Sequence, residues 1–206
     1  MKPTKEYNGR SRIRMFNCDC MDFMEDCDTY DLAIVDPPYR DENQPDQWLR
    51  ANKGDMKKWQ PSPNKFFFKA LFDSSENQII WGGNYFTEYL KPNNNWIVWH
   101  KLNEGVHFSM CELAWCSIRK NIQLKKLLPS KSKIHPTQKP VQLYKWLLTN
   151  YAKEGDTILD THGGSLSIAI ACWELGFDID VCELDTDYFN DAVKRFETHI
   201  AQTQLF

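Results

Sequence analysis

The sequence has 206 residues, a length that suits one α/β domain and leaves no room for a second large one. Apolar residues make up 42% of the chain, which is enough to fill a core, and the formal net charge is −3 at pH 7. This charge excludes a protein that coats nucleic acid with a generally basic surface, so any contact with DNA must come from a local patch.

The chain carries no pattern of a secreted, membrane-spanning or metal-binding protein. No apolar run approaches the roughly 18 residues that a membrane-spanning helix needs, and no signal-peptide pattern opens the sequence. The seven cysteines form an odd set without a CxxC pair, and the five histidines are isolated. We therefore expect a cytoplasmic protein with reduced thiols, no disulfide framework and no metal.

The first sixty residues predict two strands, a short helix and a long loop. Residues 1–11 are polar and are expected to fray, 12–16 predict a strand and 20–24 a short helix. Residues 32–35, Leu-Ala-Ile-Val, form a continuous apolar run that is typical of a central strand in a parallel sheet. Residues 40–63 then predict a mobile loop, and loops of this length in compact domains are usually functional.

From residue 64 onward, helices and strands alternate. Helices are predicted at 64–72, 84–90, 140–151, 165–175 and 186–202. Strands are predicted at 78–81, 96–100, 113–118, 122–127, 157–160 and 177–183. The alternation indicates one α/β domain over residues 1–206 with a doubly wound, mostly parallel sheet. In such sheets, ligands bind outside the carboxyl ends of the strands.

A glycine loop near the C-terminus predicts half of a nucleotide site. Residues 158–165, Ile-Leu-Asp-Thr-His-Gly-Gly-Ser, leave a buried strand and enter a helix, whose N-terminus favours an anionic group. Glu183 ends the next strand, where an acid can accept the hydroxyls of a ribose. A tight turn between strand and helix would by itself account for the two glycines, but it would not account for Glu183 at the end of the next strand. The missing G-x-G-x-x-G spacing argues against a nicotinamide cofactor.

Asp36-Pro37-Pro38-Tyr39, directly after the apolar run at 32–35, predicts catalysis at an amino group. An exocyclic base amine is a poor nucleophile, because its lone pair is delocalised into the ring. The Asp36 carboxylate and the Pro37 carbonyl can accept its two N–H groups, while proline holds both acceptors in place. Tyr39 can stack on a flipped base. A proline turn that merely ends the strand is the alternative.

These residues resemble a known family, the beta-class, circularly permuted amino-methyltransferases of DNA. The resemblance runs from about residue 12 to 200 and is most specific at His135-Pro136-Thr137-Gln138-Lys139-Pro140. It implies a seven-stranded, Rossmann-like methyltransferase fold with S-adenosyl-L-methionine as cofactor. The chain would begin at the third strand of the standard sheet and finish with the first two.

The resemblance also implies a set of cofactor contacts. They are Asp19, His135, Thr137, Gln138, Lys139, Asp160, His162, Gly163, Gly164, Ser165 and Glu183. An ordinary helix cap is the alternative explanation for Asp19. His162 stands where the family has an aromatic residue, and a packing role is favoured over proton transfer. Leu166 replaces the family's third loop glycine, which is expected to matter little inside a helix start.

Two segments are candidate DNA contacts. The basic segment, about residues 119–134, contains no acid and includes Arg119, Lys120, Lys125, Lys126, Lys131 and Lys133. The loop at 40–63 carries Trp48 and Trp59, which either close over a flipped base or only anchor the loop. An ordinary solvated loop is the alternative for the basic segment.

The sequence thus predicts a methyltransferase that acts on double-stranded DNA, with adenine N6 favoured by the aspartate at the first motif position. Cytosine N4, RNA and protein glutamine stay open as other substrates for the same chemistry. A DNA-binding relative that has lost turnover is a further alternative, because the cofactor loop is altered. Only about 95 residues separate Tyr39 from His135, which leaves no large separate domain for recognising the DNA target and suggests a homodimer that pools two surfaces.

Overall fold

The computed structural model describes residues 1–39, 62–105, 109–135 and 137–203. The loop predicted at 40–63 therefore lies almost wholly outside the described residues, and so do Trp48, Trp59 and Pro136.

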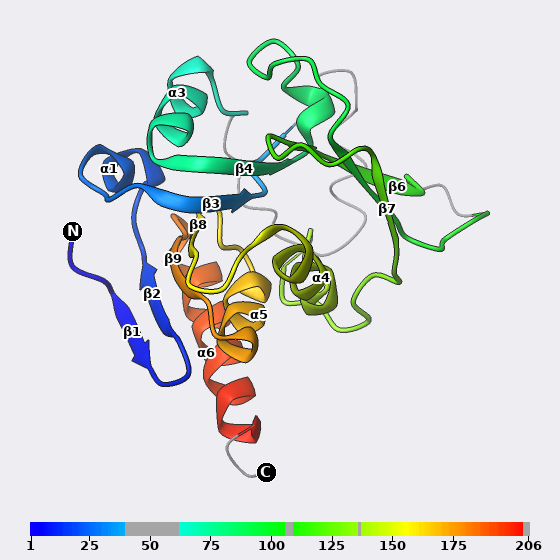
Figure 1. Cartoon of the computed structure of the whole chain (residues 1–206). Coiled ribbons are helices and arrows are strands. Elements are labelled where there is room, and N and C mark those ends of the chain that lie inside the picture. Colours follow the sequence, from blue (N-terminus) through cyan, green and yellow to red (C-terminus); the bar gives the residue numbers. More distant parts are fainter. Residues whose placement is uncertain (40–61, 106–108, 136, 204–206) are drawn as a thin grey trace.

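A single sheet forms the centre of the described structure (Figure 1). Its strands run in the order β1-β2-β9-β8-β3-β4-β6-β5-β7. In chain order they are β1 (Lys5–Asn8), β2 (Arg12–Phe16), β3 (Tyr30–Val35), β4 (Ser75–Trp81), β5 (Trp96–His100), β6 (Cys111–Cys116), β7 (Gln123–Lys126), β8 (Thr157–Asp160) and β9 (Asp178–Cys182). Strands β2, β9, β8, β3 and β4 pair in parallel, while β6 runs antiparallel to β4 and β5.

The expected permuted fold is confirmed, with β8 and β9, the last strands of the chain, inserted between β2 and β3. The described sheet has nine strands instead of seven, because β1 and β7 extend its two edges. The prediction that residues 1–11 fray is wrong. Tyr7 on β1 packs against Phe196, with ring centroids 5.1 Å apart, and this contact ties the N-terminal segment to the core.

Helices cover both faces of the sheet (Figure 1). One face carries α1 (Cys20–Glu25) and α3 (Lys65–Asp73); the other carries α4 (Val141–Tyr151), α5 (Ser167–Leu175) and α6 (Thr186–Thr203). Because side chains alternate along β3, Leu32 and Ile34 join the core under α4–α6, while Ala33 and Val35 join the core under α1 and α3. Burial on both faces accounts for the continuous apolar run.

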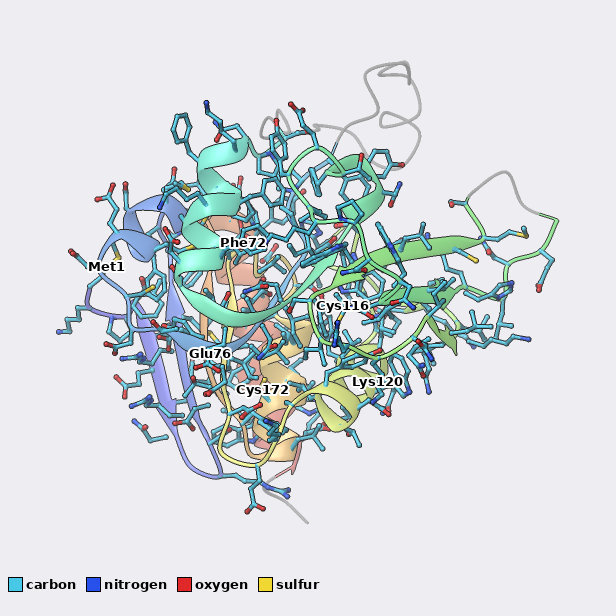
Figure 2. The ribbon with its side chains drawn as sticks, turned by 45° about the horizontal axis from the view of Figure 1, so that its top comes forward. Met1, Phe72, Glu76, Cys116, Lys120 and Cys172 are labelled. Carbon is cyan, nitrogen blue, oxygen red and sulfur yellow. The ribbon has the colours of Figure 1, made fainter. Side chains whose placement is uncertain are left out.

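Figure 2 shows the same division through two labelled residues, Phe72 on α3 and Cys172 on α5, which lie on opposite sides of the sheet. All seven cysteines lie within the described residues, and none forms a disulfide. Across the ranges that the structure describes, no helix is both long enough and apolar enough to cross a membrane.

The helix predicted at 84–90 is wrong. The structure has only a short 3₁₀ turn, η1 (Gly83–Tyr85), followed by further turns. The amides of Phe86 and Tyr89 donate to carbonyls three residues back, not four. With Pro92 closing the segment, too few residues remain to offset the entropy of nucleating an α-helix.

Candidate active site

A pocket opens at the carboxyl ends of β3, β8 and β9. From β3 it takes Asp36 and the following Pro38, and from the loops after β8 and β9 it takes the glycine loop and Glu183. The full lining is Asp36, Pro38, His135, Thr137, Gln138, Lys139, Tyr144, His162, Gly163, Gly164, Ser165, Glu183, Asp185 and Tyr188. Asp36 and Pro38 therefore meet the segment before α4, the glycine loop and Glu183 in one pocket, although about a hundred or more residues separate Asp36 from each of them.

Asp36 is paired within the protein. The Lys139 ammonium donates to Asp36 Oδ2 and lies 3.2 Å from Glu112 Oε2, and its side chain is 1% exposed. Burial raises the pKa of the Asp36 carboxyl, an effect that Lys139 opposes and Glu112 reinforces. Burial lowers the pKa of Lys139, but Asp36 and Glu112 outweigh it and raise that pKa well above its ordinary value. Lys139 is therefore a fixed cation at the catalytic motif.

Tyr39 is held by its neighbours. Its ring stacks on Tyr85, with centroids 4.5 Å apart and planes 16° from parallel, and meets Phe86 edge-on. Gly82 has φ +69°, and a Cβ on it would lie 2.4 Å from Tyr39 Cδ1. Glycine is therefore required at position 82 by the close approach of the ring as well as by the backbone.

The cofactor loop is tied to the end of β9. The Gly163 amide donates to the Cys182 carbonyl over 2.7 Å, and the Gly164 amide donates to Glu183 Oε2 over 2.8 Å. The other oxygen of Glu183 accepts the Asp185 amide over 2.9 Å. Burial raises the pKa of Glu183, while these backbone donors lower it. The carboxylate keeps further lone pairs for a ligand, as each oxygen can accept more than one hydrogen bond.

Leu166 corrects the expectation that the lost third glycine matters little. Its φ of +55° and ψ of +28° lie in the left-handed region, and α5 starts only at Ser167. The position still demands the conformation that glycine adopts at no cost. The side chain is 1% exposed and packs in the core. Arg195 from α6 donates to the Ser165 carbonyl over 2.5 Å, which holds the strained turn from below.

His162 and Asp160 lie at the base of the loop. The ring of His162 meets Phe67 edge-on at 5.4 Å, and burial lowers its pKa to about 4, so that it is neutral at pH 7. This arrangement agrees with the packing role. Asp160 is 2% exposed and accepts the His162 amide over 3.0 Å; burial raises its pKa to about 8. Asp160 is not among the residues that line the pocket.

The segment before α4 closes one side of the pocket. His135 meets Tyr188 edge-on at 4.5 Å, and its Nδ1 is 3.1 Å from Thr137 Oγ1. Burial, together with Lys139, lowers the pKa of His135 to about 4. Gln138 is buried, and its amide group bonds to the Ile134 amide and the Ser132 carbonyl. Gln138 thus shapes the segment as well as lining the pocket.

Asp19 lies outside the pocket lining. Its side chain accepts the Met21 amide over 2.8 Å at the start of α1 and is exposed, as a helix cap should be. Its contact with a cofactor stays a prediction.

The basic segment divides into two groups. Lys120, labelled in Figure 2, donates to the Asn150 carbonyl and lies over the Tyr151 ring. Lys125 lies over the Trp146 ring, so both lysines are packed on α4. The exposed group is Arg119, Lys126, Lys131 and Lys133.

Sequence reasoning missed several lining or supporting residues. These residues are Glu112, Tyr144, Asp185 and Tyr188, together with Lys101, which pairs with Glu112. These residues fit the local pattern of polar and apolar positions. Nothing in the sequence therefore distinguishes them from ordinary surface or core residues. In the described ranges, no group of three or more His, Cys, Asp or Glu side chains is placed to hold a metal ion.

The similarity of the chain to known proteins shows the family to which it belongs. The family model N6_N4_Mtase, described as DNA methylase, matches residues 42–194, which is more than half of the chain. The chain belongs to this family. It is a DNA amino-methyltransferase, and S-adenosyl-L-methionine is the cofactor of the family, as expected. No curated protein matches the sequence.

Solved structures share the fold. M1.HpyAVI in complex with S-adenosylmethionine has a TM-score of 0.65 at 20% identity, over 89% of this chain and 98% of that one. The cytosine-N4-specific PvuII DNA methyltransferase has a TM-score of 0.63 at 13% identity, over 89% and 86%. TTHA0409 of Thermus thermophilus, complexed with S-adenosyl-L-methionine, scores 0.60 at 15% identity, over 90% and 93%. At these identities the likeness concerns the fold.

The conformation of Leu166 makes a prediction about stability. Both Leu166→Gly and Leu166→Ala lose the buried side chain, but alanine keeps a left-handed strain of roughly 1–2 kcal/mol that glycine lacks. Leu166→Gly is therefore expected to be the more stable variant in urea unfolding. At Leu147, inside α4, the order should reverse, with Ala about 1 kcal/mol more stable than Gly. The same order at both positions would contradict the strain.

Proposed function

We propose that this DNA methyltransferase transfers a methyl group from S-adenosylmethionine to N6 of a flipped adenine at Asp36-Pro37-Pro38-Tyr39. The observation that carries the proposal is that Asp36 and the loop of Gly163 and Gly164 line one pocket. The carboxylate that would accept the amino group of the base and the loop that would bind the nucleotide cofactor therefore face the same pocket.

The residues of the pocket fit the cofactor. Glu183 offers a carboxylate to the ribose hydroxyls, and the neutral ring of His135 beside Tyr188 offers an apolar surface. When bound, S-adenosylmethionine supplies a methyl group on a sulfonium, a good donor that needs no metal. The side chains of Thr137 and Ser165 add polar contacts on the same wall.

On the substrate side, Asp36 and the Pro37 carbonyl accept the two N–H groups of the base and direct the nitrogen lone pair outward. Lys139 occupies Oδ2 of Asp36, which leaves Oδ1 for the base. Tyr39, backed by Tyr85, presents an aromatic surface for stacking. The aspartate at the first motif position favours adenine over cytosine, whose enzymes in this family often carry serine there.

We assign DNA contacts to three lysines of the exposed group of the basic segment, Lys126, Lys131 and Lys133. They lie at the carboxyl end of β7 or after it, and the chain of pairings from β3 through β4, β6 and β5 makes β7 run in the same direction as β3. This end of the segment therefore leaves the sheet at the same edge as the pocket, whereas Arg119 precedes β7 and lies toward the opposite edge. A homodimer would widen this surface, and a monomeric mass in light scattering with DNA at micromolar concentration would count against it.

The identity of the methylated base tests the proposed function. The protein is incubated with labelled S-adenosylmethionine and unmethylated genomic DNA, and the DNA is digested to nucleosides. We expect N6-methyladenine as the labelled product. N4-methylcytosine would overturn the adenine assignment and keep the chemistry. No labelled nucleoside, with no cofactor binding in calorimetry, would support a relative without turnover.

Replacement of the catalytic carboxylate should separate binding from chemistry. Asp36→Ala is expected to lower the methyl-transfer rate below detection, because the amino group loses its charged acceptor. The affinity for S-adenosylmethionine, measured by calorimetry, should stay within a few-fold of the unmodified protein. Activity equal to that of the unmodified protein would refute the mechanism.

The assigned DNA contacts predict a change in salt dependence. The double variant Lys126→Ala/Lys131→Ala should bind DNA more weakly and reduce the slope of log K against log salt by roughly 2, about one unit for each phosphate contact. The control Lys153→Ala/Lys194→Ala removes two exposed lysines that lie outside the basic segment and outside the pocket lining. Equal losses in both double variants would point to nonspecific attraction instead.

A further inference from the structure

Four charged side chains of alternating sign form a row behind the catalytic motif. Asp36 follows β3, Lys139 precedes α4, Glu112 lies on β6, and Lys101 follows β5. Lys139 bonds to Asp36 and lies 3.2 Å from Glu112 Oε2, while Lys101 Nζ lies 2.7 Å from Glu112 Oε1. We call these four residues the charge row.

The charge row is largely withdrawn from water. The side chain of Lys139 is 1% exposed, those of Asp36 and Lys101 are 15% and 16% exposed, and that of Glu112 is 22% exposed. The ammonium of Lys139 also lies 5.1 Å from the ring centroid of Trp81, which is fully buried. Buried charges persist only when they are paired, and the two cations of the row cancel its two anions.

We propose that Lys139 is a positioning residue for Asp36, and that Glu112 and Lys101 complete a neutral row that keeps the Asp36 carboxylate ionised and correctly turned. This inference rests on the proposed function, in which Asp36 accepts an N–H of the base. It differs from the role that the family resemblance suggested for Lys139, which was contact with the cofactor.

The geometry explains how Lys139 both keeps the Asp36 carboxylate ionised and fixes its orientation. Its bond to Oδ2 fixes the rotation of the carboxylate, so that Oδ1 faces the place of the amino group. Lys139 cannot swing toward a cofactor without leaving the Asp36 carboxylate unpaired and giving up its contact with Glu112, which would keep only Lys101 as a partner. Glu112 forms a second ion pair with the Lys139 ammonium. The Lys101 ammonium in turn balances the negative charge of Glu112.

Electrostatics predicts opposite effects for the two partners of Asp36. Burial raises the pKa of Asp36, Lys139 lowers it, and Glu112 raises it. An opposite charge at this distance typically shifts a carboxyl pKa by roughly 1–3 units. The other titratable groups of the described ranges that interact with Asp36 or Lys139 are Lys101, Tyr39, His135, Tyr144 and Asp160.

The first experiment follows the ionisation of Asp36 directly. Carbon-13 NMR of labelled aspartate carboxyls, assigned with Asp36→Asn, is recorded as a function of pH in the protein and its variants. Lys139→Met should move the midpoint of Asp36 upward by at least about one pH unit. Glu112→Gln should move the midpoint downward, because the neighbouring negative charge is lost.

The second experiment follows the reaction. Single-turnover methyl transfer is measured against pH with excess genomic DNA and labelled S-adenosylmethionine. Activity requires ionised Asp36, so it is lost as the pH falls through the pKa of that carboxyl. The acidic limb should move upward in Lys139→Met and downward in Glu112→Gln. Below the limb, each unit of upward shift lowers the rate about tenfold.

Two further variants separate positioning from damage. Lys139→Arg keeps the charge and should leave the acidic limb near its original pH, even where the plateau rate falls. Lys153→Met, an exposed lysine outside the pocket, should change neither the limb nor the NMR midpoint. General damage to the fold would not move the Lys139→Met and Glu112→Gln limbs in opposite directions.

The outcomes are distinct for the two proposals. An unchanged Asp36 midpoint in Lys139→Met overturns the positioning role, whether or not the protein is active. A large loss of S-adenosylmethionine affinity in Lys139→Met, with an unchanged acidic limb, also overturns it and restores the cofactor role. If the protein methylates no DNA but the NMR midpoints move as expected, the proposed function fails while the pairing of Lys139 with Asp36 stands.

Discussion

The buried ion pair of Asp36 and Lys139 is the interaction on which the rest of the site depends. It joins the end of β3 to the segment before α4, which are about a hundred residues apart in the chain. Either charge alone would be costly where it lies, since desolvation of an unpaired ion costs several kcal/mol, on the order of the net stability of a domain. Only a fold that brings both segments together can therefore pair these two buried charges.

The permuted sheet brings the end of β3 close to the last third of the chain. Strand β8 pairs with β9 on one side and with β3 on the other, so the last third of the chain completes the middle of the sheet. The carboxyl ends of β3, β8 and β9 then share one edge, where the catalytic motif, the glycine loop and Glu183 surround one pocket. Neither end of the chain has the pocket by itself, which couples folding of the sheet to assembly of the site.

Most of the local structure followed from the sequence. The run at Leu32–Val35 predicted a strand buried on both faces, and Asn64 and Pro140 marked the starts of α3 and α4. Two of the errors arose where a tertiary contact overrode the local pattern. Tyr7 anchors β1 through Phe196, and Leu166 is held in a left-handed turn by core packing and by Arg195, although the sequence alone suggested an ordinary helix start.

The sequence by itself determined the class of chemistry, because a motif keeps its residues adjacent and in order: Asp36 to Tyr39, the run His135 to Pro140 and the glycine loop are all legible without coordinates. Only the tertiary structure decided the partners of those residues. Glu112 and Lys101 belong to no motif that predicted their pairing, and Lys139 was assigned to the cofactor until its position beside Asp36 was known. The reason is physical. Pairing of buried charges depends on distance in space, and the fold brings together side chains of different strands and loops, a proximity that the local sequence around each of them does not record.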